Sequence, residues 1–433
     1  MKRSEAGNRG FTAPGLLLSF SAIAVYILLL WFLLRPAAGQ IFFSGPDEKG
    51  LLSALKYDKN NAAYNYLLGK FHHFNLYSPD MEKAIGRYRT SLGLIPLQPA
   101  VWIDLAKAYR LDGRSAEAES AFERAVALNP NNADLLWEAG IFWLVGERPE
   151  KAANSLKRYI QLLPEKQTVV YDLYFKMNPG NPRIYESLVP DEYGYRAGYL
   201  RYLMSTGRVE ESEAAWKTID LEQLERNLFS SYVTFLINNS RYETADALWK
   251  EITSEIEGYT KDMPGSSVSN YSFENDILEG GFDWTVRETE GVNVFIDETV
   301  RMEGRRSLAV AFNGGSNPDI LFARQVVRVR PGSKYSLRAN IKTDGLTTSN
   351  GIFVFVQGHK CAGLNKRSET VTGTNFWKEI SIDFEIPAGC GAVTVNFKRE
   401  RSNKLDNRID GIAWIDRVIM KQEAGQTSSS AML

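Results

Sequence analysis

Cysteine and histidine are scarce in this sequence, which has two cysteines and three histidines among 433 residues. His72 and His73 are adjacent in the sequence, whereas His359 lies far from both. Neither these histidines nor Cys361 and Cys390 have the spacing of a zinc-binding cluster. A zinc site is therefore not expected.

An excess of charge of either sign is absent as well. The formal net charge is −1 and the isoelectric point is about 6.4, which gives no electrostatic reason to expect a nucleic-acid partner. The sequence contains no glycine-rich phosphate loop and no nucleophile elbow. The carboxylates of residues 61–257 fall in turns and on solvated helix faces, so no positioned acid pair is recognised. We therefore predict that the chain is not an enzyme.

Charge is missing altogether from one long apolar run, residues 16–34. At about 1.5 Å per residue, a helix over this run just crosses a hydrocarbon core of roughly 30 Å. The apolar region of an export signal is usually shorter, about 7–15 residues. The run predicts a transmembrane anchor, and a signal cleaved at the small residues 37–39 is the alternative.

Basic residues flank this run unequally. Lys2, Arg3 and Arg9 precede it, whereas Arg35 is the only basic residue directly behind it. The positive-inside rule then makes residues 1–15 a cytoplasmic tail. Residues 35–60 become a juxtamembrane segment, and the bulk of the chain lies in the periplasm. We expect a single-pass protein of a bacterial inner membrane.

The two cysteines lie beyond the anchor in this orientation. An even pair in an oxidising compartment favours a disulfide between Cys361 and Cys390. Two free buried thiols are the alternative.

A repeat follows the anchor, and its clearest copy is PAVWIDLAKAYRLDGRSAEAESAFERAVALNP at residues 99–130. Positions are counted from the first proline. Large residues occupy positions 4, 11 and 24, which are Trp102, Tyr109 and Phe122. Small residues occupy positions 20 and 27, which are Ala118 and Ala125. This pattern resembles the tetratricopeptide repeat, with Ala106 replacing the glycine of position 8. A second copy follows 34 residues later, where Gly140 and Ala152 occupy positions 8 and 20.

The same pattern, less regular, extends over residues 61–257. We expect about five helix pairs there, with residues 167–190 as an irregular joint. One pair cannot bury its own apolar face, so neighbouring pairs stack into a superhelix with a concave groove. The resemblance predicts a protein partner in this groove.

Beyond residue 257 the composition and the period both change. Residues 258–269 are rich in glycine, serine and proline, which is typical of a linker. Segments such as KYSLRANIKT and EISIDFEIP then alternate apolar and polar residues with period two. This alternation predicts an all-β antiparallel jelly-roll sandwich over residues 270–422. Residues 423–433 are predicted to be a disordered tail.

The order of the motifs NYSFEN, EGRRSLAVAF, FWKEISIDFEIP and GIAWIDRVIM adds a second resemblance. Over residues 270–421 the sequence resembles carbohydrate-binding modules of the galactose-binding-like class, in particular those appended to xylanases and related glycosidases. Members often hold a structural calcium ion near their first and last strands. Glu274 and Asp416 match those positions, and calcium prefers oxygen ligands. Capping of turns is the alternative role for both carboxylates.

Strand parity suggests where a saccharide would bind. In GIFVFVQGH the aliphatic residues should face the core, which leaves their neighbours on an outer face. The predicted outward set, combined with that of the other strands, is Phe353, Phe355, Gln357, Arg338, Asn340, Asn396 and Lys398. Aromatic rings beside amides and cations suit a saccharide platform, and a docking surface for the helical repeats is the alternative.

These expectations combine into one hypothesis. The chain would be a membrane-anchored periplasmic scaffold that recruits a protein through its repeats and touches a glycan or envelope component through its jelly roll. Extracellular polysaccharide or cell-envelope assembly is the expected process, by analogy of architecture. A carbohydrate-binding receptor, or an accessory protein for glycan degradation, is the alternative.

Overall fold

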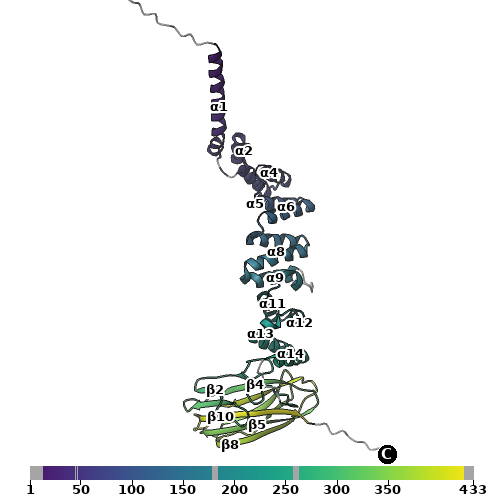
Figure 1. The fold of residues 1–433 in the computed structure, drawn as a ribbon, viewed down its shortest axis with the longest axis vertical. Coiled ribbons are helices and arrows are strands. Elements are labelled where there is room, and N and C mark those ends of the chain that lie inside the picture. Colours follow the sequence, from purple (N-terminus) through teal and green to yellow (C-terminus); the bar gives the residue numbers. More distant parts are fainter. Residues whose placement is uncertain (1–12, 44, 46, 178–183, 257–262, 424–433) are drawn as a thin grey trace, which may run out of the picture. The chain divides into compact units, whose positions relative to one another are not determined.

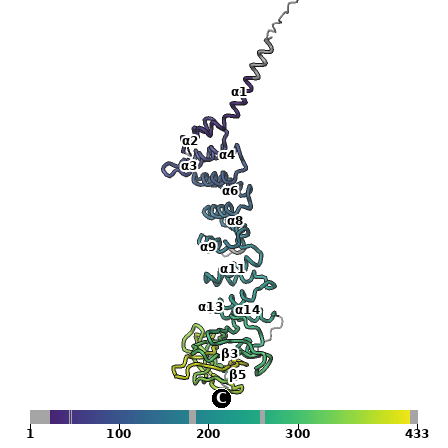
Figure 2. The backbone as a smooth tube through the Cα atoms, turned by 90° about the vertical axis from the view of Figure 1, so that its left-hand side faces the viewer, coloured from purple at the N-terminus to yellow at the C-terminus, as the bar shows by residue number. Residues whose placement is uncertain are grey.

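The computed structural model describes residues 13–43, 45, 47–177, 184–256 and 263–423 (Figures 1 and 2). Its helices come first along the chain and its strands last. The chain divides into two compact units, Met1–Pro190 and Asp191–Leu433.

The first helix of the first unit is α1, Ala13–Ile41. Its part from Ile23 to Ile41 is long and apolar enough to cross a membrane, judged by length and composition, and only 6% of it is buried. Most of the predicted cytoplasmic tail lies outside the described residues.

The predicted juxtamembrane segment contains a helix that we did not expect, α2, Glu48–Tyr57. Asp47 caps it, because its Oδ1 accepts a hydrogen bond from the Gly50 N–H at 3.0 Å. Leu51 and Ala54 lie on one face of the helix and are fully buried.

Three helix pairs follow, and they confirm the predicted tetratricopeptide-like repeats. Their bounds are Ala62–Phe74 (α3) with Met81–Leu94 (α4), Pro99–Leu111 (α5) with Ser115–Leu128 (α6), and Ala133–Val145 (α7) with Pro149–Leu162 (α8). Phe122 of α6 stacks on Phe142 of α7, with ring centroids 4.3 Å apart. Consecutive pairs therefore share apolar contacts, as a stacked array requires.

The predicted joint has shorter elements: the 3₁₀ turn η1 (Pro164–Lys166), α9 (Gln167–Met177) and α10 (Ile184–Leu188). The second unit then adds α11 (Tyr193–Ser205), α12 (Val209–Trp216), η2 (Leu221–Gln223), α13 (Arg226–Asn238) and α14 (Tyr242–Glu255). Trp216 stacks on Tyr232 at 4.6 Å and Trp249 stacks on Phe229 at 5.2 Å. Both tryptophans pack between helices.

The strands form two antiparallel five-stranded sheets, as the jelly-roll prediction requires. Sheet A has the order β1 (Thr285–Val286), β4 (Ile320–Arg328), β9 (Ala392–Arg399), β6 (Ile352–Gly358), β7 (Asn365–Arg367). Sheet B has the order β2 (Val292–Asp297), β3 (Ser307–Asn313), β10 (Asp410–Gln422), β5 (Lys334–Leu346), β8 (Gly373–Glu385).

The apolar residues of both sheets form one core. Leu337, Val354 and Val395 each expose 1% or less of their surface, so the predicted parity of these strands is confirmed. The core also includes Val268, from the segment predicted to be a linker. The sandwich therefore begins before Asn270. Residues 257–262 and the end of the predicted tail, 424–433, lie outside the described residues.

Within the second unit, α13 and α14 pack against the loop that precedes β1. Gly281 has φ of +62°, and a Cβ atom there would lie 2.5 Å from Cζ3 of Trp249. The Gly281 N–H donates to Oγ1 of Thr234 at 2.7 Å, and the Phe282 ring meets Trp249 edge-on at 6.3 Å. Only glycine fits this close approach without strain.

Small residues within the repeats can be tested directly. A Cβ atom at Gly140 would lie 2.4 Å from Cδ2 of Leu156, so Gly140→Ala should overpack α7 against α8 and cost about 1–3 kcal/mol of unfolding free energy. Gly86→Ala is the matched control, because no atom lies within 4 Å of that Cβ. It should stabilise α4 by about 0.5–1 kcal/mol. Urea unfolding followed by circular dichroism measures both, and equal effects of the two substitutions would contradict the packing described here.

Candidate functional site

The outer face of sheet A carries one row of residues that crosses all five strands. Paired positions of adjacent strands give the row in order: Thr285, Arg324, Asn396, Phe355 and Arg367. The residues next to them in sequence, such as Ala323, Val354 and Val395, belong to the core. Because side chains alternate along a strand, the whole row points away from the core.

A second row runs beside the first, toward the Gly358 end of β6. It consists of Val326, Thr394, Gln357 and Asn365. Asn396 is 2% exposed, and its Nδ2 donates to Oγ1 of Thr394 at 2.8 Å. Gln357 is exposed. The glutamine amide is therefore open to a ligand, whereas the asparagine amide is engaged within the sheet.

The two phenylalanines of β6 differ in accessibility. Phe353 is 2% exposed, and the guanidinium of Arg367 lies over its ring at 3.9 Å. Phe355 is only partly buried, and its ring centroid lies 5.9 Å from that of Phe353. Of the two rings predicted to form a platform, Phe355 is thus the one that a ligand could reach.

The cations beside Phe353 have acidic partners. Lys398 forms ion pairs with Asp319 at 3.0 Å and with Glu400 at 3.9 Å. Arg367 pairs with Glu400 at 3.3 Å. This end of the face is therefore close to neutral.

Two residues of the predicted platform lie elsewhere. Arg338 and Asn340 belong to β5 and so to sheet B, where Arg338 pairs with Glu379 at 3.6 Å and Asn340 is only 4% exposed. The seven predicted residues therefore do not share one face. The chain crosses from one sheet to the other between β5 and β6, and strand parity separates inside from outside without indicating the sheet.

The helix pair of α13 and α14 borders sheet A at the Gly358 end of β6. The Tyr242 ring meets His359 edge-on at 6.1 Å, and Lys360 donates to the backbone oxygen of Asn238. Phe353 lies toward the opposite end of β6. The helices therefore contact the end of this face, and their contacts at His359 and Lys360 do not involve Phe353 or Phe355.

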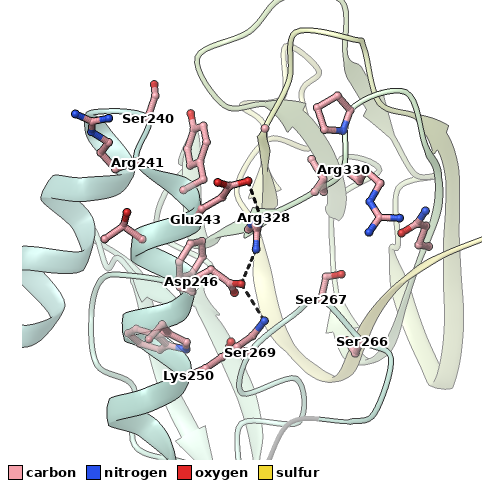
Figure 3. A pocket seen from close by; sticks show the side chains of 18 of the residues that line it. Ser240, Arg241, Glu243, Asp246, Lys250, Ser266, Ser267, Ser269, Arg328 and Arg330 are labelled. Carbon is pink, nitrogen blue, oxygen red and sulfur yellow. Dashed lines mark hydrogen bonds and ion pairs between the residues drawn. The ribbon is translucent and has the colours of Figure 1, made fainter.

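An ion-pair cluster strengthens the same contact (Figure 3). Arg328 of β4 bonds Asp246 at 2.8 Å and Glu243 at 3.4 Å, and Lys250 also bonds Asp246, at 2.9 Å. These residues line a cleft of about 950 Å³ between α14 and the sandwich.

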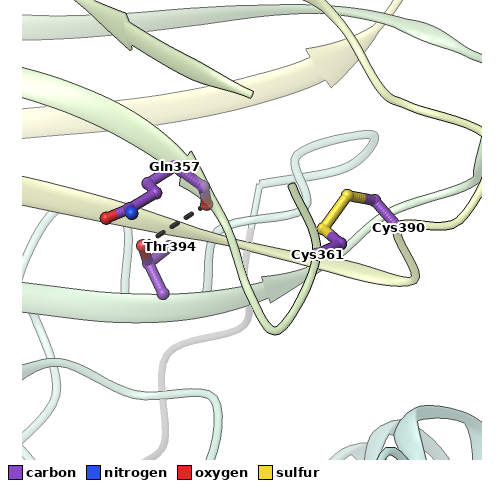
Figure 4. Close-up of a disulfide and its surroundings, with 4 residues drawn as sticks. All are labelled: Gln357, Cys361, Cys390 and Thr394. Atoms are coloured by element: carbon purple, nitrogen blue, oxygen red, sulfur yellow. Dashed lines mark hydrogen bonds between the residues drawn. A yellow bond between two sulfur atoms is a disulfide. The ribbon is translucent and has the colours of Figure 1, made fainter. Parts of the chain in front are cut away.

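A disulfide joins Cys361 and Cys390, whose Cα atoms lie 5.5 Å apart (Figure 4). The cysteines follow β6 and precede β9, so the bond links the turns at the ends of neighbouring strands. Gly391, directly after Cys390, lies against the Tyr242 ring. The disulfide therefore supports the surface on which α14 packs.

The two carboxylates predicted to hold calcium face backbone N–H groups instead. Asp416 is fully buried, and its oxygens accept bonds from the Ser272 hydroxyl and from three backbone N–H groups, at 2.6–3.2 Å. Glu274 Oε1 accepts bonds from the Arg305 and Arg306 N–H groups.

Both carboxylates therefore bind N–H and O–H donors of the protein, and their backbone partners at residues 302, 303, 305 and 306 lie in the loop before β3. These contacts suit the alternative role of turn capping, and calcium binding stays a prediction.

Comparisons with known protein families agree with this architecture. The family model described as a tetratricopeptide repeat matches residues 99–132, and the model described as a carbohydrate binding domain matches residues 265–403. The chain joins tetratricopeptide repeats to a carbohydrate-binding domain. Both kinds of domain are non-catalytic, in keeping with their roles in protein and carbohydrate binding.

Similar proteins cover only parts of the chain. The tRNA nuclease WapA of Bacillus subtilis (strain 168) is 28% identical over 181 residues, which are 40% of this chain and 7% of that protein. The structure of TmCBM61 in complex with β-1,4-galactotriose covers 36% of this chain and 99% of its own, with 17% identity and a TM-score of 0.27. The structure of YrrB, a tetratricopeptide repeat protein with an unusual peptide-binding site, matches 49% of this chain and 95% of its own, with 16% identity and a TM-score of 0.25.

The geometry around Asp416 predicts no response to calcium. The melting temperature of the purified chain should be the same in calcium chloride and in EDTA, because a ligand that binds only the folded state raises it. Differential scanning fluorimetry over a calcium titration measures this. As a control for the role of the carboxylate, Asp416→Asn should lower the melting temperature in both buffers, since it places an amide NH₂ against N–H donors. A melting temperature that rises with calcium would contradict this assignment.

Proposed function

We propose that this protein is a membrane-anchored periplasmic scaffold. Its repeats recruit a protein partner, and the outer face of sheet A binds a polysaccharide during extracellular polysaccharide or cell-envelope assembly. The observation that carries the proposal is the cross-strand row, in which the accessible ring of Phe355 stands among polar side chains of a carbohydrate-binding domain. The apolar part of α1 supplies the anchor.

The chemistry of the face suits a sugar ring. Phe355 offers an aromatic surface for stacking, which contributes on the order of 1 kcal/mol beyond area burial. Gln357, one row away, offers an exposed amide for hydroxyl groups, and each net hydrogen bond adds about 0.5–1.5 kcal/mol. A few such contacts correspond to a Kd of roughly micromolar to millimolar.

The repeats offer a separate surface for a protein partner. In the first unit a hollow of about 530 Å³ lies among α4, α5 and α6. Its lining combines apolar and charged side chains, among them Leu92, Trp102, Tyr109, Arg89 and Glu117. A peptide with apolar anchors and flanking charges would suit it. We assign no catalytic step to any part of the chain.

The glycan site can be tested with one ring and a matched control. Phe355→Ala should remove retention of the detergent-solubilised protein on polysaccharide affinity gels while changing the melting temperature by only a few degrees, because the ring is partly exposed. Phe376→Ala is the control: this ring is 92% exposed on β8 of sheet B, so its loss should leave retention unchanged.

Two results would count against the proposal. One is normal retention of the Phe355→Ala variant on a gel that retains the wild type. The other is loss of retention in the Phe376→Ala variant, which would move the site to sheet B.

A further inference from the structure

The centre of the sheet A face holds a cation without an acidic partner. Arg324 is the β4 member of the cross-strand row, opposite Asn396 and Thr285, and it is exposed. Among the described residues it forms no ion pair, in contrast to Arg328, Arg367 and Lys398 on the same face. The positive charge at this point is therefore not neutralised by the protein.

A second arginine lies beside it. The Arg287 N–H donates to the backbone oxygen of Phe322 at 3.0 Å, so the chain after β1 continues along β4. Arg287 stands two residues after Thr285, which places it on the same face as Arg324. Desolvation, and then the charge of Arg287, lower the pKa of Arg324. Two cations thus share one part of the face.

Glu279 is the acidic residue that interacts with Arg287 of this pair, but its carboxylate is hydrogen-bonded to the backbone. Glu279 interacts electrostatically with Arg287, but its Oε2 accepts a hydrogen bond from the Val286 N–H at 3.3 Å. It forms no ion pair with either arginine in the described part of the chain. Like charges held together without a counter-charge favour the binding of an anion.

A buried polar atom lies on the same side of the sheet. His359 follows Gln357 by two residues, so it shares the outward direction, and it is 9% exposed. Its Nε2 is buried and has no hydrogen-bond partner among the described residues. Burial, followed by the charges of Arg324 and Lys360, lowers the pKa of His359.

We propose that the polysaccharide bound at this face is acidic, and that its carboxylates bind Arg324 and Arg287 while a neighbouring sugar stacks on Phe355. This inference rests on the proposed glycan-binding function. A guanidinium binds a carboxylate through two parallel hydrogen bonds, which selects it over a hydroxyl. Arg324 and Phe355 are two strands apart, roughly 9–10 Å, which is close to the length of a disaccharide.

The test compares two polymers that share one sugar backbone, one charged and one uncharged. Polygalacturonate carries one carboxylate per sugar, and its full methyl ester carries the same backbone without charge. Binding of the detergent-solubilised full chain to each is measured by affinity electrophoresis at low and at high salt. The wild type should bind the acidic form at least about tenfold more tightly at low salt, and the difference should shrink as salt screens the charges.

Substitutions then locate the effect. Arg324→Gln should lower affinity for the acidic polymer about tenfold and leave affinity for the ester unchanged, and adding Arg287→Gln should remove the remaining preference. Arg338→Gln is the control, because this arginine lies on the outer face of sheet B. It should change neither affinity.

The outcomes separate the inference from the function on which it rests. Equal binding of both polymers, or an acid preference that survives the double substitution, overturns the acidic ligand while the glycan site stands. Retention of both polymers by Phe355→Ala overturns the proposed glycan site itself. Failure of the wild type to bind either polymer contradicts both.

Discussion

The antiparallel register of β4, β9 and β6 is the constraint on which the binding face depends. The same pairing that puts Val354 opposite Phe397 in the core puts Phe355 opposite Asn396 on the outside. A slip of one residue would turn the phenylalanine inward and expose the valine. The core therefore fixes the face, since burial of one set of side chains determines the position of the other. The proposed glycan-binding face thus follows from a packing requirement of the sandwich.

The contact between α14 and the sandwich lies at one end of the outer face of sheet A. Arg328 reaches two acidic residues of α14, Glu243 and Asp246, and the Tyr242 ring packs on the turn that the disulfide supports. Exposed ion pairs stabilise a protein only slightly, so the aromatic contacts of Trp249 and Phe282 contribute more to this packing. The last repeat is thus bound to the carbohydrate-binding domain on one side of the proposed glycan site.

Much of this architecture could be predicted from periodicity, and the exceptions have physical causes. The two-residue period correctly predicts the inward residues of β5, β6 and β9. A two-layer sandwich has two outer faces, however, and the period does not distinguish them. The prediction therefore places Arg338 of sheet B on the same face as Phe355 of sheet A. Parity also could not show that Arg367 covers Phe353, because that contact comes from the next strand. The segment RQVVRV does not alternate regularly, because the inward Gln325 is polar, so the pattern alone does not reveal that Arg324 points outward. Helix α2 lies outside the repeat pattern, and the Asp47 cap is its one clear sequence signal.

Hydroxyl-radical footprinting of side chains tests the central claim, that sheet A is the ligand face. The solubilised chain is oxidised with and without an oligosaccharide that it retains, and the modified residues are located by mass spectrometry. Binding should protect Phe355 on sheet A and leave Phe376 on sheet B as reactive as before. Protection of Phe376 with an unchanged Phe355 would contradict the account, because the ligand would then lie on the opposite face of the sandwich.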